Sequence, residues 1–214
     1  MSWPAPVPTF PLTDLPAGDA AVVSDRRSVA AEIDGLGGIP AVWGVEQSDM
    51  VVEVVVEGGL TRLIAIFQSR DPARIGPVRS VRTSDFGVLT PLKRPLLVFS
   101  GGNEGTVQMA RSAPLLAFMP LSAEGDDVFW RVRSLRAPHN LFAPVPEVRS
   151  HAEQGMSPQP LFDFSPNAPV GRTVGTVKAR LTWTLRSADG APMALAPGRT
   201  WMVVVPGFAR ITSE

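Results

Sequence analysis

Apolar and polar residues follow one another along this chain in short runs, and these runs predict strands more often than helices. Runs dense in β-branched and aliphatic residues predict strands at 28–33, 49–56, 60–68, 95–99 and 128–132. Gly58 and Gly59 lie between two of these runs. Because glycine adopts the positive φ of a tight turn without steric cost, 49–56 and 60–68 are expected to form a hairpin.

Three helices are predicted among these strands. Ser80 is a residue type that caps helices, and an apolar stripe follows it at Val81, Val88, Leu89 and Leu92, which predicts a helix from Ser80 to about Leu92. A second helix is expected at about 104–111 and a third within 144–155. Together with the strands, these helices predict an α+β fold in which a few helices flank a mixed β-sheet.

Changes in composition divide the chain into four parts. Residues 1–27 mix Pro, Asp and Ala without a period and predict an extended lead-in, and 28–156 form the main α+β domain. A linker rich in Pro, Ser, Gly and Asn follows at 157–175. The remainder, 176–214, is a short C-terminal β segment with strands at 176–185 and 201–205, joined by turns at Asp189-Gly190 and Pro197-Gly198.

The composition excludes several classes of function. The chain has no Cys and only two His among 214 residues, which excludes disulfides and thiolate sites and leaves little for a metal, so no metal and no cofactor is expected. The 20 basic and 20 acidic side chains cancel, which argues against non-specific nucleic-acid binding. The longest apolar runs are far shorter than the ~20 residues of a transmembrane helix.

The densest polar cluster lies at 74–85, where Arg79, Ser80, Arg82 and Asp85 follow one another closely. If Ser80 caps the predicted helix, its N-terminal amides and the guanidinium groups of Arg79 and Arg82 together form a seat for phosphate, sulfate or carboxylate. Arg82 and Asp85 are three residues apart and would share a helical face. In the alternative interpretation the cluster is only structural, because Arg82 pairs with Asp85 and Arg79 with Glu57 or another acid.

Two further polar motifs lie at predicted strand ends. Glu57 and Arg62 flank the predicted hairpin turn, where functional groups often gather, although the pair can equally serve to fix the turn. The stretch Ser100-Gly101-Gly102-Asn103 joins a strand to a helix but matches neither common phosphate-binding motif. Its glycines can instead let the backbone pass close to a neighbouring element.

His139 and Asn140 follow Pro138 in a predicted loop. A histidine and a serine invite comparison with hydrolases, in which His139 would be the base and Ser80 or Ser100 the nucleophile. Asp85 or Glu57 would then orient the histidine. No nucleophile elbow of the form G-x-S-x-G is present, so a structural histidine is the simpler interpretation.

Several segments together resemble the YerB-like family of bacterial lipoproteins, a domain of unknown function. The resemblance rests on Pro11-Leu12-Thr13, on 57–62 (EGGLTR), on 76–85 (GPVRSVRTSD), on 100–103 (SGGN), on 138–142 (PHNLF) and on 195–201 (LAPGRTW). It implies an extracytoplasmic protein of the cell envelope, tethered to the membrane by a lipidated cysteine, with no established activity. The signal and the acceptor cysteine are absent from this chain, so either its start is truncated or this member stays inside the cell. Its C-terminal region is shorter than the family's, which leaves two alternatives, a complete or an incomplete second domain.

The leading hypothesis is a non-catalytic binding protein of the bacterial envelope whose partner is an anionic small molecule or an envelope polymer. Its expected ligand-binding residues are Arg62, Arg79, Ser80, Arg82, Asp85, Ser100, Asn103, His139 and Asn140, with Glu57 helping to shape the site. One alternative is a hydrolase acting on a wall or phosphate-containing polymer, with His139, Glu57 and Asp85 as catalytic candidates. The other is a structural module that binds a protein partner.

Overall fold

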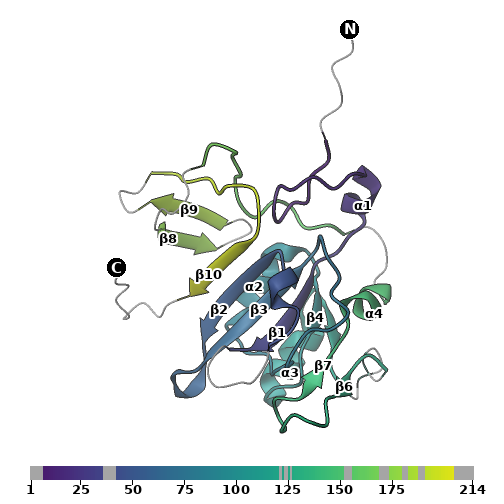
Figure 1. The fold of residues 1–214 in the computed structure, drawn as a ribbon. Helices are drawn as coiled ribbons and strands as arrows, with labels where there is room; N and C mark the ends of the chain where they lie inside the picture. Colours follow the sequence, from purple (N-terminus) through teal and green to yellow (C-terminus); the bar gives the residue numbers. More distant parts are fainter. Residues whose placement is uncertain are drawn as a thin grey trace.

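The computed structural model describes residues 7–35, 42–120, 122, 125, 127–151, 156–168 and 191–204, and the backbone alone of 174–179 and 183–187. A six-stranded mixed sheet forms its centre, in the order β10-β2-β3-β1-β4-β5 (Figure 1). These strands span Thr200–Val204 (β10), Met50–Val55 (β2), Thr61–Phe67 (β3), Val29–Asp34 (β1), Leu96–Val98 (β4) and Leu116–Phe118 (β5). The predicted α+β fold with a mixed sheet is confirmed.

Strand pairing confirms the predicted hairpin, because β2 and β3 are antiparallel and connected through Gly58 and Gly59, both at φ 73°. β1 is antiparallel to β3, whereas β4 and β5 run parallel to β1. At the other edge β10 runs parallel to β2. The strand predicted at 176–185 is wrong, since Val174–Ala179 (β8) and Trp183–Ser187 (β9) form a separate antiparallel pair. The Asp189-Gly190 turn lies outside the described residues.

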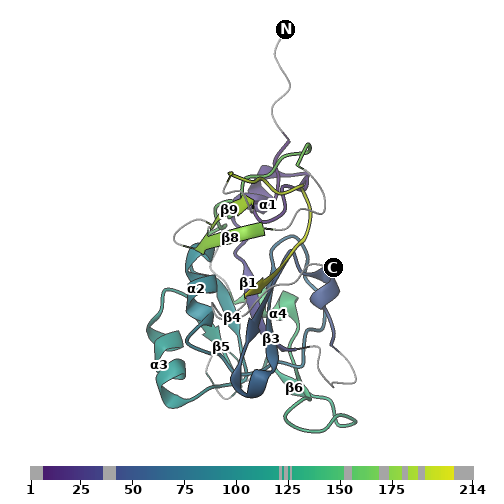
Figure 2. The same ribbon diagram turned by 90° about the vertical axis from the view of Figure 1, so that its left-hand side faces the viewer.

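Both faces of the central strands β1 and β3 are buried, whereas the edge strand β10 is largely exposed. Even-numbered residues of β1 and β3, such as Ala30 and Ile66, pack in one cluster with apolar residues of α2 (Asp85–Leu89), η3 (Thr90–Leu92) and α3 (Glu104–Ser112). Odd-numbered residues, such as Val29 and Phe67, pack on the opposite face against β7 (Leu141–Phe142) and α4 (Val145–Ser150). Burial of each Val, Leu, Ile or Phe side chain in these clusters stabilises the fold by about 1.5–3 kcal/mol. Figure 2 shows the sheet edge-on between these two layers.

The remaining short elements are η1 (Val45–Gln47), η2 (Glu57–Gly59), β6 (Trp130–Arg131) and α1 (Ala20–Ser24). The one-turn helix α1 lies within the segment predicted as an extended lead-in, and Oδ1 of Asp19 accepts a hydrogen bond from the Ala21 amide at its start. The strand predicted at 128–132 and the helix predicted within 144–155 are present in shortened form, as β6 and α4.

The helix predicted from Ser80 to Leu92 is wrong in its first turn, because α2 begins only at Asp85 and Ser84 occupies its N-cap position. Residues 77–82 are extended, and their backbone groups form hydrogen bonds with other elements. The Arg79 amide donates to the Glu32 carbonyl over 2.7 Å, and the Ser100 amide donates to the Arg79 carbonyl over 2.7 Å. A helix here would forfeit these bonds, so tertiary pairing overrides local propensity.

The extended segment 77–82 lies where β4 stops pairing with β1. Val78 bridges Ile33 near the end of β1, beyond the three β1 residues that pair with β4. The carboxyl ends of the parallel strands β1 and β4 therefore meet the segment at one edge of the sheet. In open sheets that contain parallel strands, this edge is where ligands bind.

Candidate functional site

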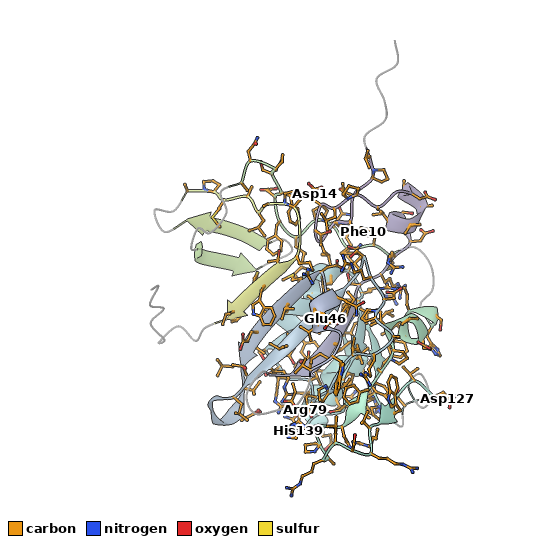
Figure 3. The ribbon with its side chains drawn as sticks, in the orientation of Figure 1. Phe10, Asp14, Glu46, Arg79, Asp127 and His139 are labelled. Atoms are coloured by element: carbon orange, nitrogen blue, oxygen red, sulfur yellow. The ribbon has the colours of Figure 1, made fainter. Side chains whose placement is uncertain are left out.

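Asp34, the last residue of β1, is the centre of a charged cluster at this edge. Arg62 faces Asp34 directly in the β1–β3 register. The Nδ1–H of His139 donates a hydrogen bond to Oδ2 of Asp34, and Nε of Arg79 forms an ion pair with the same oxygen at 3.5 Å. Figure 3 shows Arg79 and His139 beside each other at one end of the molecule. We call Asp34, Arg62, Arg79 and His139 the Asp34 cluster.

The outward atoms of this cluster carry unused hydrogen-bonding capacity. Within the described residues, the two Nη groups of Arg79 and the Nε2 of His139 have no hydrogen-bond partner. The His139 side chain is 42% exposed, whereas that of Asp34 is 12% exposed. Asp34 thus holds both groups from the inside, while their outer nitrogens face towards solvent. Arg79 pairs with this carboxylate, and Arg62 lies opposite it in the strand register.

Arg62 forms the buried floor of the cluster. Its side chain is 5% exposed, and its Nη1 donates to the Ser80 carbonyl over 3.2 Å, while its Nε has no partner. Burial and the nearby charge of Arg79 lower the pKa of Arg62, and the charges of Asp34 and Glu32 oppose this effect. Because an arginine pKa starts far above neutrality, Arg62 remains charged.

Glu32 and Asp85 are buried side by side behind Arg62. Glu32 is fully buried, and neither of its carboxyl oxygens has a hydrogen-bond partner among the described residues. The carboxyl of Asp85 is close enough for its charge to act on Glu32. Burial, and after it the charge of Asp85, raise the pKa of Glu32 well above its ordinary value. The pKa of Asp85 is raised by burial as well, although bonds from the Arg82 amide and the Ser84 hydroxyl, the latter at 3.0 Å, oppose the change. Burial therefore favours the protonated form of Glu32 over the ionised form.

Arg82 pairs with Glu57 across the surface. Its Nε lies 2.9 and 3.0 Å from the two carboxylate oxygens of Glu57, and this hydrogen bonding lowers the pKa of Glu57. The predicted helical face shared by Arg82 and Asp85 is wrong, because Arg82 precedes the helix and contacts Asp85 through its backbone amide. Glu57 and Arg62, which flank the hairpin turn, both contact the 79–82 segment: Glu57 pairs with Arg82, and Arg62 donates to the Ser80 carbonyl.

The other predicted ligand-binding residues lie around the cluster and support its backbone. Ser80 and Ser100 contribute main-chain bonds, Ser80 through its carbonyl and Ser100 through its amide. Asn103 is the N-cap of α3, and its Oδ1 accepts from the Thr106 amide at 2.8 Å. A Cβ on Gly102 would lie 2.5 Å from Oγ1 of Thr106, so this glycine does permit a close approach of the backbone.

Asn140 is buried and fixes the loop that carries His139. Its Oδ1 accepts a 2.7 Å hydrogen bond from Arg131, and its Nδ2 donates to the Leu135 carbonyl over 3.3 Å. Both ends of the side-chain amide are therefore used within the loop, which holds His139 in place against Asp34.

Two central residues, Asp34 and Glu32, were missed by the sequence interpretation. It assigned the partner of His139 to Asp85 or Glu57, which bond elsewhere. The signal was present in the alternation of β1, where Glu32 and Asp34 occupy positions of the same parity as the buried Ala30. Polar residues at core-facing positions of a strand indicate a buried polar site.

Other features of the described residues lie apart from this cluster. An open, largely apolar groove of about 510 Å³ is lined by Val42, Val45, Glu46, Ser48, Val51, Arg199, Thr200 and Trp201, none of which is a candidate residue. No group of three or more acidic or histidine side chains arranged to hold a metal occurs among the described residues. In the same part of the chain, no helix is both long and apolar enough to cross a membrane.

Comparison with known proteins gives consistent results for sequence and fold. Residues 12–157 match the family model described as "Protein of unknown function (DUF3048) N-terminal domain". The chain is 32% identical over 144 residues to the "Putative lipoprotein YerB" of Bacillus subtilis (strain 168), a match covering 67% of this chain and 42% of that protein. This chain therefore spans less than half of that relative.

The crystal structure of YerB protein from Bacillus subtilis has a similar fold, with a TM-score of 0.77 and 19% identity over 93% of this chain and 97% of the crystallised one. The family match extends over most of the charged residues described above, from Glu32 to His139. The chain belongs to the YerB-like DUF3048 family, whose function is uncharacterised.

Proposed function

We propose that this chain is a non-catalytic binding protein whose Asp34 cluster holds an anionic group such as phosphate. The observation that supports the proposal is that Asp34 engages the inner nitrogens of Arg79 and His139 and leaves their outer nitrogens without partners in the described residues. A guanidinium with free Nη groups presents parallel N–H donors that match the oxygens of phosphate or carboxylate.

Local electrostatics support an anion at this position. Arg62 and Arg79 approach each other closely enough for the charge of Arg79 to lower the pKa of Arg62. Binding of an anion would relieve this repulsion. By contrast, Arg82 is already paired with Glu57, so we assign it a supporting role at the edge of the site.

Replacing Arg79 by alanine should weaken binding of phosphate or sulfate about 10- to 100-fold, the loss expected when charge-assisted hydrogen bonds worth about 1.5–3 kcal/mol are removed. Isothermal titration with inorganic phosphate and with sulfate would measure the effect. Arg79→Lys should restore only part of the affinity, because lysine keeps the charge but lacks the planar fork.

Arg111→Ala is the matched control, since Arg111 is an exposed arginine in the last turn of α3. It removes the same charge at a distance from the cluster and should leave phosphate affinity unchanged. The proposal would be rejected if Arg79→Ala, folded as shown by circular dichroism, bound each anion as tightly as the unsubstituted protein.

An extracytoplasmic location is part of the proposal. It rests on the relative named "Putative lipoprotein YerB", and an anionic envelope component is then the natural ligand class.

A protein-interaction role without an anion would require every cation of the Asp34 cluster to be paired within the protein. The unpartnered Nη groups of Arg79 argue against that alternative.

A hydrolase is the second candidate, and the Asp34–His139 pair is the observation that favours it. A carboxylate on Nδ1 orients an imidazole so that Nε2 can take a proton, as a general base requires. No serine hydroxyl is hydrogen-bonded to His139 in the described part of the chain, so water would be the nucleophile. If this candidate holds, phosphate release from polyphosphate should fall at least ~100-fold in His139→Ala. Equal release by both proteins would exclude His139 as the base.

A further inference from the structure

We infer that the loop between β6 and β7 extends the Asp34 cluster into a binding strip for a linear polymer of phosphate groups. This inference rests on the proposed function and names the ligand class of the same site. The loop, residues 132–140, begins after Arg131 and ends with His139 and Asn140. We call residues 131–140 the basic hairpin.

The basic hairpin contains positively charged side chains and no acidic residue. It carries Arg131, Arg133 and Arg136 beside His139, and the sequence contains no acidic residue between Asp127 and Glu147. Asp127 itself lies well apart from Arg79 and His139 in Figure 3. All three arginines are exposed, and neither Arg133 nor Arg136 forms an ion pair with any residue that the structure describes.

The backbone of the basic hairpin is held by its own hydrogen bonds. The Val132 amide donates to the Asn140 carbonyl over 2.8 Å, the Leu135 amide to the Val132 carbonyl over 3.2 Å, and the His139 amide to the Arg136 carbonyl over 2.9 Å. The last bond places Arg136 in the same turn as His139. The arginines therefore project from an ordered backbone joined directly to the Asp34 cluster, which lowers the entropy cost of binding several charges at once.

A single phosphate would engage Arg79 and His139 and leave Arg133 and Arg136 uncompensated. A chain of phosphate groups offers further charges at short intervals and can neutralise the cluster and the hairpin together. Binding of such a polyanion releases counterions, so affinity should depend steeply on salt.

The composition of the basic hairpin favours a soluble polymer over a membrane or a nucleic acid. None of its residues is an exposed large apolar side chain; the exposed Trp130 lies just before it and packs against Phe142 with ring centroids 6.3 Å apart. A surface of this kind has charge but neither an apolar anchor for lipid nor aromatic residues for stacking bases. The hairpin also lies at the opposite end of the molecule from the first described residues (Figures 1 and 2), so an attachment near the N-terminus would leave it accessible.

The test compares long-chain polyphosphate with orthophosphate for four proteins: the unsubstituted chain, Arg133→Ala/Arg136→Ala, Arg79→Ala and the control Arg70→Ala/Arg111→Ala. The control removes the same net charge from exposed positions elsewhere. The hairpin variant should bind polyphosphate about 10-fold more weakly and show a flatter salt dependence, while its orthophosphate affinity stays unchanged. Arg79→Ala should lose affinity for both ligands, and the control for neither.

Polyphosphate binding that is unaffected in the hairpin variant, or equally reduced in the control, would overturn this inference and leave the proposed anion site standing. If the unsubstituted chain bound neither orthophosphate nor polyphosphate, both this inference and the proposed anion site would be overturned. Hairpin-dependent binding to phosphatidylglycerol vesicles without binding to polyphosphate would replace the polymer by a membrane surface. Circular dichroism of each variant would confirm that its fold is retained, as expected for exposed side chains.

Discussion

Replacing Arg62 by methionine is expected to lower the free energy of unfolding by about 3 kcal/mol, because the buried guanidinium stabilises the ionised form of the buried Asp85 carboxyl and donates to the Ser80 carbonyl. Arg62 is 5% exposed and faces Asp34 across the β1–β3 register. Its positive charge also stabilises the ionised form of Glu32. Methionine retains most of the apolar volume, so the loss would report on charge and on the hydrogen bond to the Ser80 carbonyl rather than on a cavity.

Urea denaturation followed by circular dichroism would measure the change, with Arg111→Met as the exposed control. A loss below about 1 kcal/mol for Arg62→Met, equal to that of the control, would show that Arg62 does not hold the cluster together. Orthophosphate affinity of the folded variant provides a second readout. It should fall as well, since the segment with Arg79 is fixed partly through the Ser80 carbonyl.

The central strands could be predicted from the sequence because their residues suit one local structure. β2 and β3 are dense in Val, Ile and Leu, and Gly58 and Gly59 supply the two positive φ angles of the connection. The strand at Leu96–Val98 was predictable for the same reason. In these segments the local preference and the tertiary structure agree.

The helix predicted from Ser80 failed because distant residues decide the conformation of 77–82. Cap chemistry and an apolar stripe were present locally, yet β1 and Gly101 supply backbone partners that the sequence pattern cannot show. The dependence on residues distant in the sequence also explains why the centre of the site was missed. Arg62, Arg79 and His139 were identified as candidates, but their common partner Asp34 is 105 positions from His139 in the chain, and only the fold brings the two together.

Glu32 should make the protein less stable as the pH rises, and its replacement by glutamine should remove this dependence. Burial and the neighbouring charge of Asp85 raise the pKa of Glu32 in the folded state above its ordinary value of 4.5, while Arg62 and Arg82 oppose the shift. The folded protein therefore keeps a proton that the unfolded chain releases. The stability associated with that proton is complete below the unfolded pKa and is lost as the pH rises through the folded pKa.

Across that window, which begins above about pH 4.5, the unsubstituted protein should lose about 1.4 kcal/mol of unfolding free energy per pH unit relative to Glu32→Gln. Asp85 shifts in the same direction and is present in both proteins, so their difference reports Glu32 together with its coupling to Asp85. Urea denaturation from pH 4 to 9 would measure the difference, with Glu53→Gln in β2 as the control. Parallel pH profiles for the unsubstituted protein and Glu32→Gln would mean that Glu32 ionises in the fold as it does in water. The ionised carboxylate of Glu32 would then lie beside Arg62 together with Asp34, and this added negative charge would weaken the attraction of the site for an anion.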